Sequence, residues 1–354
     1  MQDQPKDAAQ LEIVLPAPDF GAELAFWTAR GFRLDTIWPA DDPAVARMSG
    51  RNLRLRLERE AAEPVTLRVE GTGEDATSPG GTRLVHGPGV PEFGMPEVQQ
   101  GFGLRRLSDG APWVIGRAGM QYRDLVPNRL GGAIIASHIR IPDGGPVPDM
   151  VHYHTVGFQL IFCHRGWVDL VYEDQGEPFR LDAGSCVIQP PEIRHRVLHA
   201  SDEIEVIEIG VPAVHVTTID HEMTLPNGHI DRDRQFGGQR FVHHREAEAE
   251  WHPARQAGFV SRDTTIAANT GDVAGVRVLR AEGETEAFTQ DADIHFTFVR
   301  QGRMVLEIDG DRHEVTASDA FVLPPHTPVR YAEPSNDLEL LEVTLPGSPA
   351  FGAA

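Results

Sequence analysis

The sequence predicts a mainly β protein in which two tandem β barrels or sandwiches follow a small βαβββ module. Residues 114–348 break into short apolar runs separated by Gly, Pro or Asp, with almost no helical pattern between them. Segments of this stretch recur about 135 residues later, which indicates a duplicated domain. Residues 10–72 instead show one strand pattern, one helical pattern and three further strand patterns, which predicts the small α+β module.

The amino-terminal module begins with "LEIVLPAP" (11–18), a strand pattern that ends at proline, and continues with "DFGAELAFWTARGF", a helical pattern capped by Asp19. Its βαβββ order resembles half of a vicinal-oxygen-chelate (glyoxalase-like) domain. In that family, histidine and glutamate bind the metal, but residues 11–71 contain no histidine. We therefore interpret the module as an interaction unit, and we expect a homodimer in which a second subunit covers its sheet.

The Gly- and Pro-rich residues 73–113 read as a linker or covering arm. After it, "DAGSCVIQPPEIRHRV" (182–197) recurs as "TASDAFVLPPHTPVRY" (316–331), and "SDEIEVIEIGVP" (201–212) recurs as "SNDLELLEVTLP" (335–346). We expect one barrel over 114–215, a connection over 216–252 and a second barrel over 253–348. Within the second barrel, Asp309-Gly310 predicts a tight hairpin.

Composition excludes several classes of partner. The formal net charge of −21 disfavours nucleic acid and anionic membranes, because their phosphates would be repelled. No apolar run approaches the roughly 18 residues that cross a bilayer, and "MQDQPKDAAQ" lacks the apolar segment of a secretory signal. Two cysteines, Cys163 and Cys186, make no disulfide framework, so we expect a cytoplasmic protein with reduced thiols.

Three histidines are the candidate metal ligands. His152 and His154 alternate along a predicted strand, so both imidazoles lie on one face and can reach one ion. His195 follows a Pro-Pro turn about forty residues later, and a hairpin can bring it beside that strand. The alternative, that these are ordinary histidines with satisfied hydrogen bonds, stays open on the residues alone.

The wider spacing resembles the two motifs of the cupin family. His-x-His, four residues, Gln159, six residues and Gly166 match the first motif, and Gly184, five residues, Pro190 and then His195 are close to the second. The chain thus resembles a bicupin, which implies jelly-roll barrels and a divalent metal bound by His152, His154, Gln159 and His195. The implied ion is Fe²⁺, with Mn²⁺, Ni²⁺, Cu²⁺ or Zn²⁺ as alternatives.

Gln159 departs from the cupin pattern, in which glutamate usually stands at this position. A neutral amide oxygen would leave the ion its full charge, which weakens binding but makes a stronger Lewis acid. Alternatively Gln159 does not bind the metal, and three histidines leave two or three positions open.

The second half has lost the ligand set. Alignment of the repeat places Phe288, Gln290, His295 and Val329 where the first half has His152, His154, Gln159 and His195. We therefore expect the second barrel to be a structural partner.

Two further residues are candidates for catalysis. Arg140 can clamp a substrate carboxylate or enolate if its side of "ASHIRI" faces inward, and His199 shares the strand face of His195 by alternation. The simpler interpretations are that Arg140 lies on a solvated strand face and that His199 is a polar residue at the rim of the barrel.

We expect an oxidoreductase of the dioxygenase type acting on a small organic substrate chelated to the metal. The alternatives are a non-redox lyase, isomerase or epimerase, and a sensor or storage module that binds a small molecule without turnover.

Overall fold

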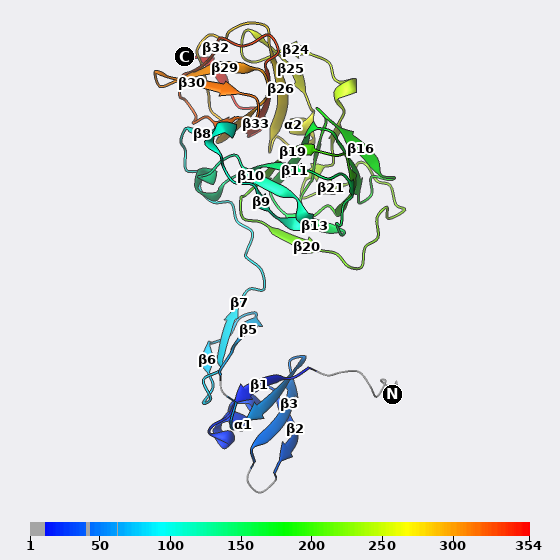
Figure 1. The fold of residues 1–354 in the computed structure, drawn as a ribbon, viewed down its shortest axis with the longest axis vertical. Helices are drawn as coiled ribbons and strands as arrows, with labels where there is room; N and C mark the ends of the chain where they lie inside the picture. Colours follow the sequence, from blue (N-terminus) through cyan, green and yellow to red (C-terminus); the bar gives the residue numbers. More distant parts are fainter. Residues whose placement is uncertain (1–10, 40–42, 62) are drawn as a thin grey trace. The chain divides into compact units, whose positions relative to one another are not determined.

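The computed structural model describes residues 11–39, 43–61 and 63–354, and the chain divides between Glu92 and Phe93 into two compact units (Figure 1). The stretch 1–10, in which the sequence predicted no secretory signal, lies outside the described residues. Within the described part of the chain, no helix combines the length and apolar character needed to span a bilayer.

The amino-terminal unit contains a four-stranded sheet of order β1-β4-β3-β2, in which β1 runs parallel to β4. Helix α1 packs its buried Trp27 against one face, and Asp19 caps it by accepting a hydrogen bond from the Ala22 amide at 3.1 Å. A second sheet of order β5-β7-β6 completes the unit. The elements are β1 (Ile13–Pro16), α1 (Phe20–Thr28), β2 (Arg33–Trp38), β3 (Val45–Gly50), β4 (Leu53–Glu58), β5 (Thr66–Glu70), β6 (Ala76–Thr77) and β7 (Arg83–Gly87).

The carboxy-terminal unit begins with a jelly roll made of two facing sheets, here called the first jelly roll. One sheet has the order β23-β17-β14-β19-β11-β10-β9 and the other the order β16-β15-β18-β13-β20. Its strands are β9 (Val114–Ile115), β10 (Gln121–Asp124), β11 (Ile135–Ile141), β12 (Gly145–Pro146), β13 (His152–Thr155), β14 (Phe158–Arg165), β15 (Trp167–Tyr172), β16 (Phe179–Asp182), β17 (Cys186–Ile188), β18 (His195–Ala200), β19 (Ile204–Val211), β20 (Val216–Ile219) and β23 (His243–His244).

The second jelly roll repeats this plan, with sheets of order β24-β25-β26-β33-β28-β31-β8 and β30-β29-β32-β27-β34. Its elements are β8 (Gly103–Arg105), β24 (His252–Pro253), β25 (Phe259–Asp263), α2 (Ile266–Asn269), β26 (Gly275–Ala281), β27 (Phe288–Gln290), β28 (Ile294–Gln301), β29 (Arg303–Ile308), β30 (Asp311–Thr316), β31 (Ala320–Val322), β32 (Val329–Ala332), β33 (Glu339–Leu345) and β34 (Phe351–Ala353). A small hairpin, β21 (Gln235–Phe236) and β22 (Gln239–Arg240), lies between the jelly rolls in sequence.

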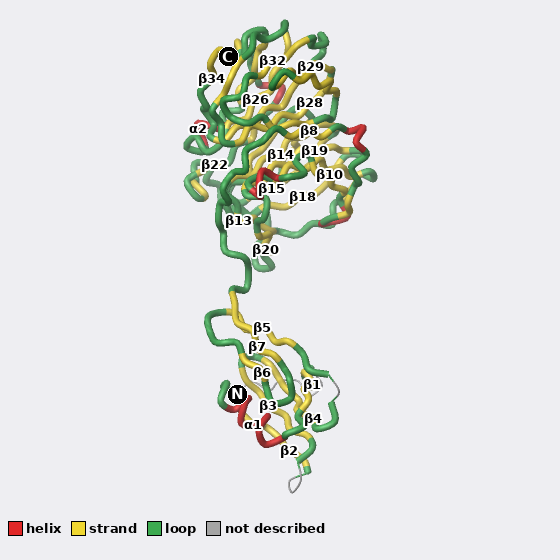
Figure 2. The backbone as a smooth tube through the Cα atoms, turned by 90° about the vertical axis from the view of Figure 1, so that its left-hand side faces the viewer, coloured by secondary structure: helices red, strands yellow, loops and turns green. Residues whose placement is uncertain are grey.

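Both jelly rolls consist of strands and loops with only short helical turns, four of them 3₁₀ turns in the described chain (Figure 2). The mainly β fold with two jelly rolls that the sequence predicted is confirmed. The hairpin expected at Asp309-Gly310 is present, since both residues have positive φ and join β29 to β30.

The two jelly rolls exchange their leading strands. β8, which precedes the first jelly roll in sequence, pairs with β31 of the second, with Arg105 opposite Ala320. Likewise β23, which precedes the second jelly roll, pairs with β17 of the first. The seven-stranded sheet of each jelly roll is therefore completed by a strand that lies next to the other jelly roll in sequence.

A shared core joins the two jelly rolls. One cluster of buried apolar side chains includes Phe158 and Phe162 from the first and Phe296 and Phe298 from the second. Buried arginines repeat the exchange, because Arg123 Nη2 donates to the Ser318 carbonyl (2.8 Å) and Arg262 Nη2 donates to the Gly184 carbonyl (2.9 Å). Ser318 and Gly184 occupy equivalent positions of the repeat, so the interface is two-fold in character.

Both cysteines are buried thiols. Burial raises the pKa of Cys163 and that of Cys186 to about 12, because the thiolate would lose its hydration. The expectation of reduced cysteines agrees with this structure.

Candidate metal centre

The three histidines of the sequence pattern converge in the first jelly roll. β13 and β18 are antiparallel neighbours, and His152 is the register partner of His195. His154 lies two residues along β13 and so points to the same face. One ring nitrogen from each histidine lies within 4.8 Å of the others, and all three side chains are buried. A set of three imidazole nitrogens this close fits a divalent transition metal.

Local chain geometry fixes the turn that delivers His195. Pro190 and Pro191 follow β17, which ends at Ile188, and the Ile193 amide donates to the Pro190 carbonyl at 3.1 Å to close the turn. The Glu192 amide donates to the His154 carbonyl at 3.0 Å, which ties this turn to β13. The two bursts of histidine in the sequence are therefore held together by backbone bonds.

Hydrogen bonds on the outer side of the rings orient them. Nδ1 of His152 donates to the Met150 carbonyl (2.8 Å), and Nδ1 of His195 donates to the Ile193 carbonyl (2.9 Å). Because a carbonyl only accepts, each of these rings carries its proton on Nδ1 and its lone pair on Nε2. His154 Nδ1 contacts the Thr217 hydroxyl at 2.8 Å. Such support is typical of histidines that bind metals.

Gln159 lies on β14 and is fully buried. Its Nε2 donates to Oε1 of Glu208, on β19, at 2.7 Å. Among the residues that the structure describes, its Oε1 has no hydrogen-bond partner although it is buried. A buried amide oxygen costs free energy unless it is satisfied, so this atom is suited to a ligand absent from the protein itself, such as a metal.

A cavity of about 80 Å³ adjoins the histidines. Its polar lining residues include His154, His195, Gln189 and Glu208. The remaining walls are apolar apart from the Tyr122 hydroxyl, and comprise Met120, Tyr122, Ile139, Ile141, Ile161, Val168, Leu170, Val197, Ile204 and Val206. A more open cavity of about 620 Å³ shares Tyr122, His154 and Glu208 with it. We call the smaller one the inner cavity and the larger one the outer cavity, and His154 lines both.

Neither catalytic candidate from the sequence is brought to these cavities. Arg140 lies on the opposite face of β11 from Ile139 and Ile141, where its Nε donates to Gln121 and its guanidinium stacks on Trp113. His199 is exposed and stacks on Trp167. A β-bulge interrupts the pairing of β18 with β15 before His199, and this extra residue reverses the alternation that began at His195.

Glu208, Thr217 and His215 are site residues that the sequence reasoning did not single out. Glu208 shares a strand face with Ile204 and Val206, and a lone acid on an apolar face was the available signal. Its recurrence as Glu342 in the repeat was a second signal. His215, whose ring centroid lies 5.6 Å from that of His154, and Thr217 come from the segment after the barrel pattern.

In the second jelly roll, Phe288 pairs with Val329 just as His152 pairs with His195. Phe288, Val329 and Tyr331 belong to an apolar cluster. His295 lies 3.2 Å from Glu342, the equivalent of the Gln159–Glu208 pair.

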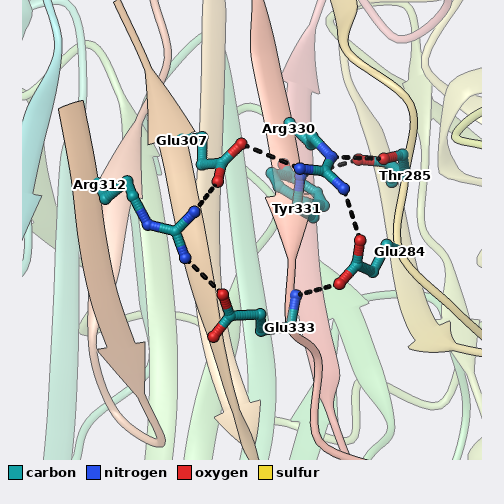
Figure 3. A network of polar contacts seen from close by, with 7 residues as sticks. All are labelled: Glu284, Thr285, Glu307, Arg312, Arg330, Tyr331 and Glu333. Atoms are coloured by element: carbon teal, nitrogen blue, oxygen red, sulfur yellow. Dashed lines mark hydrogen bonds and ion pairs between the residues drawn. The ribbon is translucent and has the colours of Figure 1, made fainter. Parts of the chain in front are cut away.

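A network of ion pairs joins partly exposed side chains of the second jelly roll (Figure 3). Arg330 binds Glu284 and Glu307, and Arg312 binds Glu307 and Glu333. The network ties β29, β30 and β32 to the loop before β27.

Comparison with known proteins places the fold. The model of the AraC-like ligand binding domain family matches residues 273–353, within the second jelly roll. Comparison with curated proteins gave no match.

Several solved structures are similar over most of the chain. Salicylate 1,2-dioxygenase from Pseudaminobacter salicylatoxidans has a TM-score of 0.53 and 14% identity, covering 73% of this chain and 90% of that one. Oxalate decarboxylase from Bacillus subtilis has a TM-score of 0.54 and 12% identity, covering 71% and 78%. Protein Ylba from E. coli has a TM-score of 0.51 and 12% identity, covering 71% and 93%. At these identities the likeness shows the fold alone: this chain has the fold of the cupin-family bicupins.

Proposed function

We propose that the protein is a metal-dependent cupin enzyme, an oxidoreductase of the dioxygenase type that acts on a small organic substrate. The observation that carries this proposal is the convergence of His152, His154 and His195, because His154 and His195 also line a largely apolar cavity. Three neutral nitrogen donors leave coordination positions for other molecules. Fe²⁺ is the ion we propose, with Mn²⁺, Ni²⁺, Cu²⁺ or Zn²⁺ as alternatives. Bound iron would supply a Lewis acid and a redox centre.

The protein's own groups have separable tasks in this proposal. The three histidines would hold the ion, and Gln159 would offer Oε1 as a fourth ligand, since Glu208 accepts a hydrogen bond from its amide nitrogen. The apolar walls around Ile161 exclude water and accommodate the carbon skeleton of the substrate. Glu208 is the one acidic side chain that lines this cavity.

A sensor or storage protein is the second candidate, because the family match in the second jelly roll is to a ligand binding domain. A non-redox lyase, isomerase or epimerase would use the same metal to polarise a carbonyl. These alternatives differ in what they consume. The oxygenase consumes O₂ with its substrate, the lyase or isomerase turns over without O₂, and the sensor binds without turnover.

Oxygen uptake by the full chain reconstituted with Fe²⁺ tests the proposal. The panel comprises enolisable acids, phenols and thiols. We expect O₂ consumption stoichiometric with at least one substrate, and its loss in His195→Ala. Turnover without O₂ uptake would favour the lyase or isomerase, and thermal stabilisation without turnover would favour the sensor. Absence of bound metal would overturn the enzyme proposal altogether.

We also propose that the amino-terminal module acts as a glyoxalase-like half module that pairs two subunits. Supporting this, its βαβββ sheet exposes Leu34 and Leu53. Light scattering should give twice the chain mass of 38.9 kDa. Changing both leucines to arginine should give the monomer mass, and a wild-type monomer would contradict the proposal.

A further inference from the structure

The outer cavity carries a positively charged residue from an unexpected part of the chain. Arg105 ends β8, the strand that pairs with β31 of the second jelly roll. It nevertheless lines the same cavity as His154 and Glu208 of the first jelly roll. The exchanged strand therefore places a guanidinium in the lining of a cavity that His154 also lines.

The guanidinium of Arg105 is not engaged in an ion pair with any described residue. Among the described residues, the side chain of Arg105 forms no hydrogen bond or ion pair, and its Nε is buried without a partner. The other arginine of the cavity, Arg129, is already bound to Asp124 through two bonds of 3.1 Å. A buried donor of a charged group left without an acceptor is costly, so this site favours an anionic ligand.

The size of the charge identifies the class of anion. One unpaired guanidinium supplies a single positive charge and matches a carboxylate in the bidentate geometry that arginine favours. A phosphate carries a charge of about −1.5 to −2 near neutrality, and it would meet Asp124 and Glu208 in the same cavity. The lining therefore suits a monoanion better than a phosphate.

The rest of the lining describes the body of this ligand. Ala111, Pro112, Val114 and Ile135 give the outer cavity apolar walls, and most of the residues that line the inner cavity are apolar too. Resting on the function proposed above, we propose that the substrate is a small carboxylate with an apolar body. Arg105, held by the sheet of the second jelly roll, binds the carboxylate and selects for it. The second jelly roll thereby contributes to specificity although it lacks the histidines.

Calorimetric titration of the full chain tests this assignment with carboxylates and their neutral amides: benzoate against benzamide, phenylacetate against phenylacetamide, and hexanoate against hexanamide. We expect at least one carboxylate to bind the wild type at least about 10-fold more tightly than its amide, as expected for loss of one charge-assisted interaction. Arg105→Met should lower the affinity for that carboxylate by a similar factor and abolish the preference. Arg105→Lys should lose less of this affinity than Arg105→Met, because lysine keeps the positive charge.

Arg106→Met is the matched control, because Arg106 is the next residue, is outside the cavity and donates to the Glu314 carbonyl. It should bind the carboxylate as the wild type does. The inference is overturned if no carboxylate binds, if each amide binds equally well, or if Arg105→Met binds as the wild type does. Metal content is measured on the same samples. Arg105-dependent binding without metal would refute the enzyme and keep the carboxylate site, whereas metal without such binding would refute only the carboxylate site.

Discussion

Replacing Gln159 by glutamate restores the residue that the cupin motif usually carries and tests the geometry around it. In the structure, Gln159 Nε2 donates to Glu208 Oε1 at 2.7 Å, and Gln159 is fully buried. Gln159→Glu therefore brings two carboxylates together where the wild type has a donor and an acceptor. Without a metal, the variant should be less stable than the wild type at neutral pH.

The magnitude follows from that distance. Two unit charges 2.7 Å apart repel by about 6 kcal/mol at an effective dielectric constant of about 20. Taking up one proton is cheaper, since keeping a carboxyl of ordinary pKa near 4.3 protonated at pH 7 costs about 4 kcal/mol. The folded protein thus binds a proton that the unfolded chain does not. Its stability is retained below the unfolded pKa and falls as pH rises, so the cost is only about 1 kcal/mol at pH 5.

Chemical denaturation in the presence of a chelator, at pH 5 and pH 7, measures this difference. A loss of about 4 kcal/mol corresponds to a fall in Tm of about 10 °C for a unit of this size. Gln235→Glu is the control, because Gln235 is exposed and should tolerate the charge at both pH values. Gln159→Glu should also bind the metal more tightly, since the new ligand is anionic. Equal stability of variant and wild type at pH 7 would show that Gln159 and Glu208 do not face one another.

Three further outcomes follow from the structure. Thr217→Val should weaken metal binding about 10-fold in a chelator competition, because it removes the contact that orients His154, whereas Thr218→Val should not; equal affinities would refute this support. Cys163 and Cys186 should resist thiol reagents at pH 8 until the protein unfolds, since burial raises their pKa to about 12, and rapid labelling of the native protein would contradict that burial. Phe296→Ala should lower the free energy of unfolding by about 3 to 5 kcal/mol, because it removes a side chain from the shared core. Both jelly rolls should then unfold at a lower temperature in a single transition, and separate transitions in calorimetry would contradict a shared core.

The duplicated jelly-roll fold was predictable because its signals are local in sequence. Short apolar runs, turn residues such as Asp309-Gly310 and the recurrence of whole segments each report on neighbouring residues. The exchange of β8 and β23 between jelly rolls was not predictable, because strands of two or three residues carry no pattern of their own. They are strands only because they pair with strands that lie far away in the sequence.

The site residues likewise divide into those that a local sequence pattern could predict and those that it could not. The positions of His152 and His154 follow from strand alternation, which holds over a few residues. Alternation failed for His199, because a bulge adds one residue to the strand. Arg105 reaches the cavity only through the exchanged strand, so no local pattern could assign it.

Metal content of the purified chain tests the central claim most directly, namely that one ion is bound in the first jelly roll and none in the second. Elemental analysis after reconstitution should give one metal per chain for the wild type and close to none for His195→Ala. His326→Ala should retain one, because His326 lies exposed in the equivalent turn of the second jelly roll. A wild type without metal, or equal loss in both variants, would contradict the account.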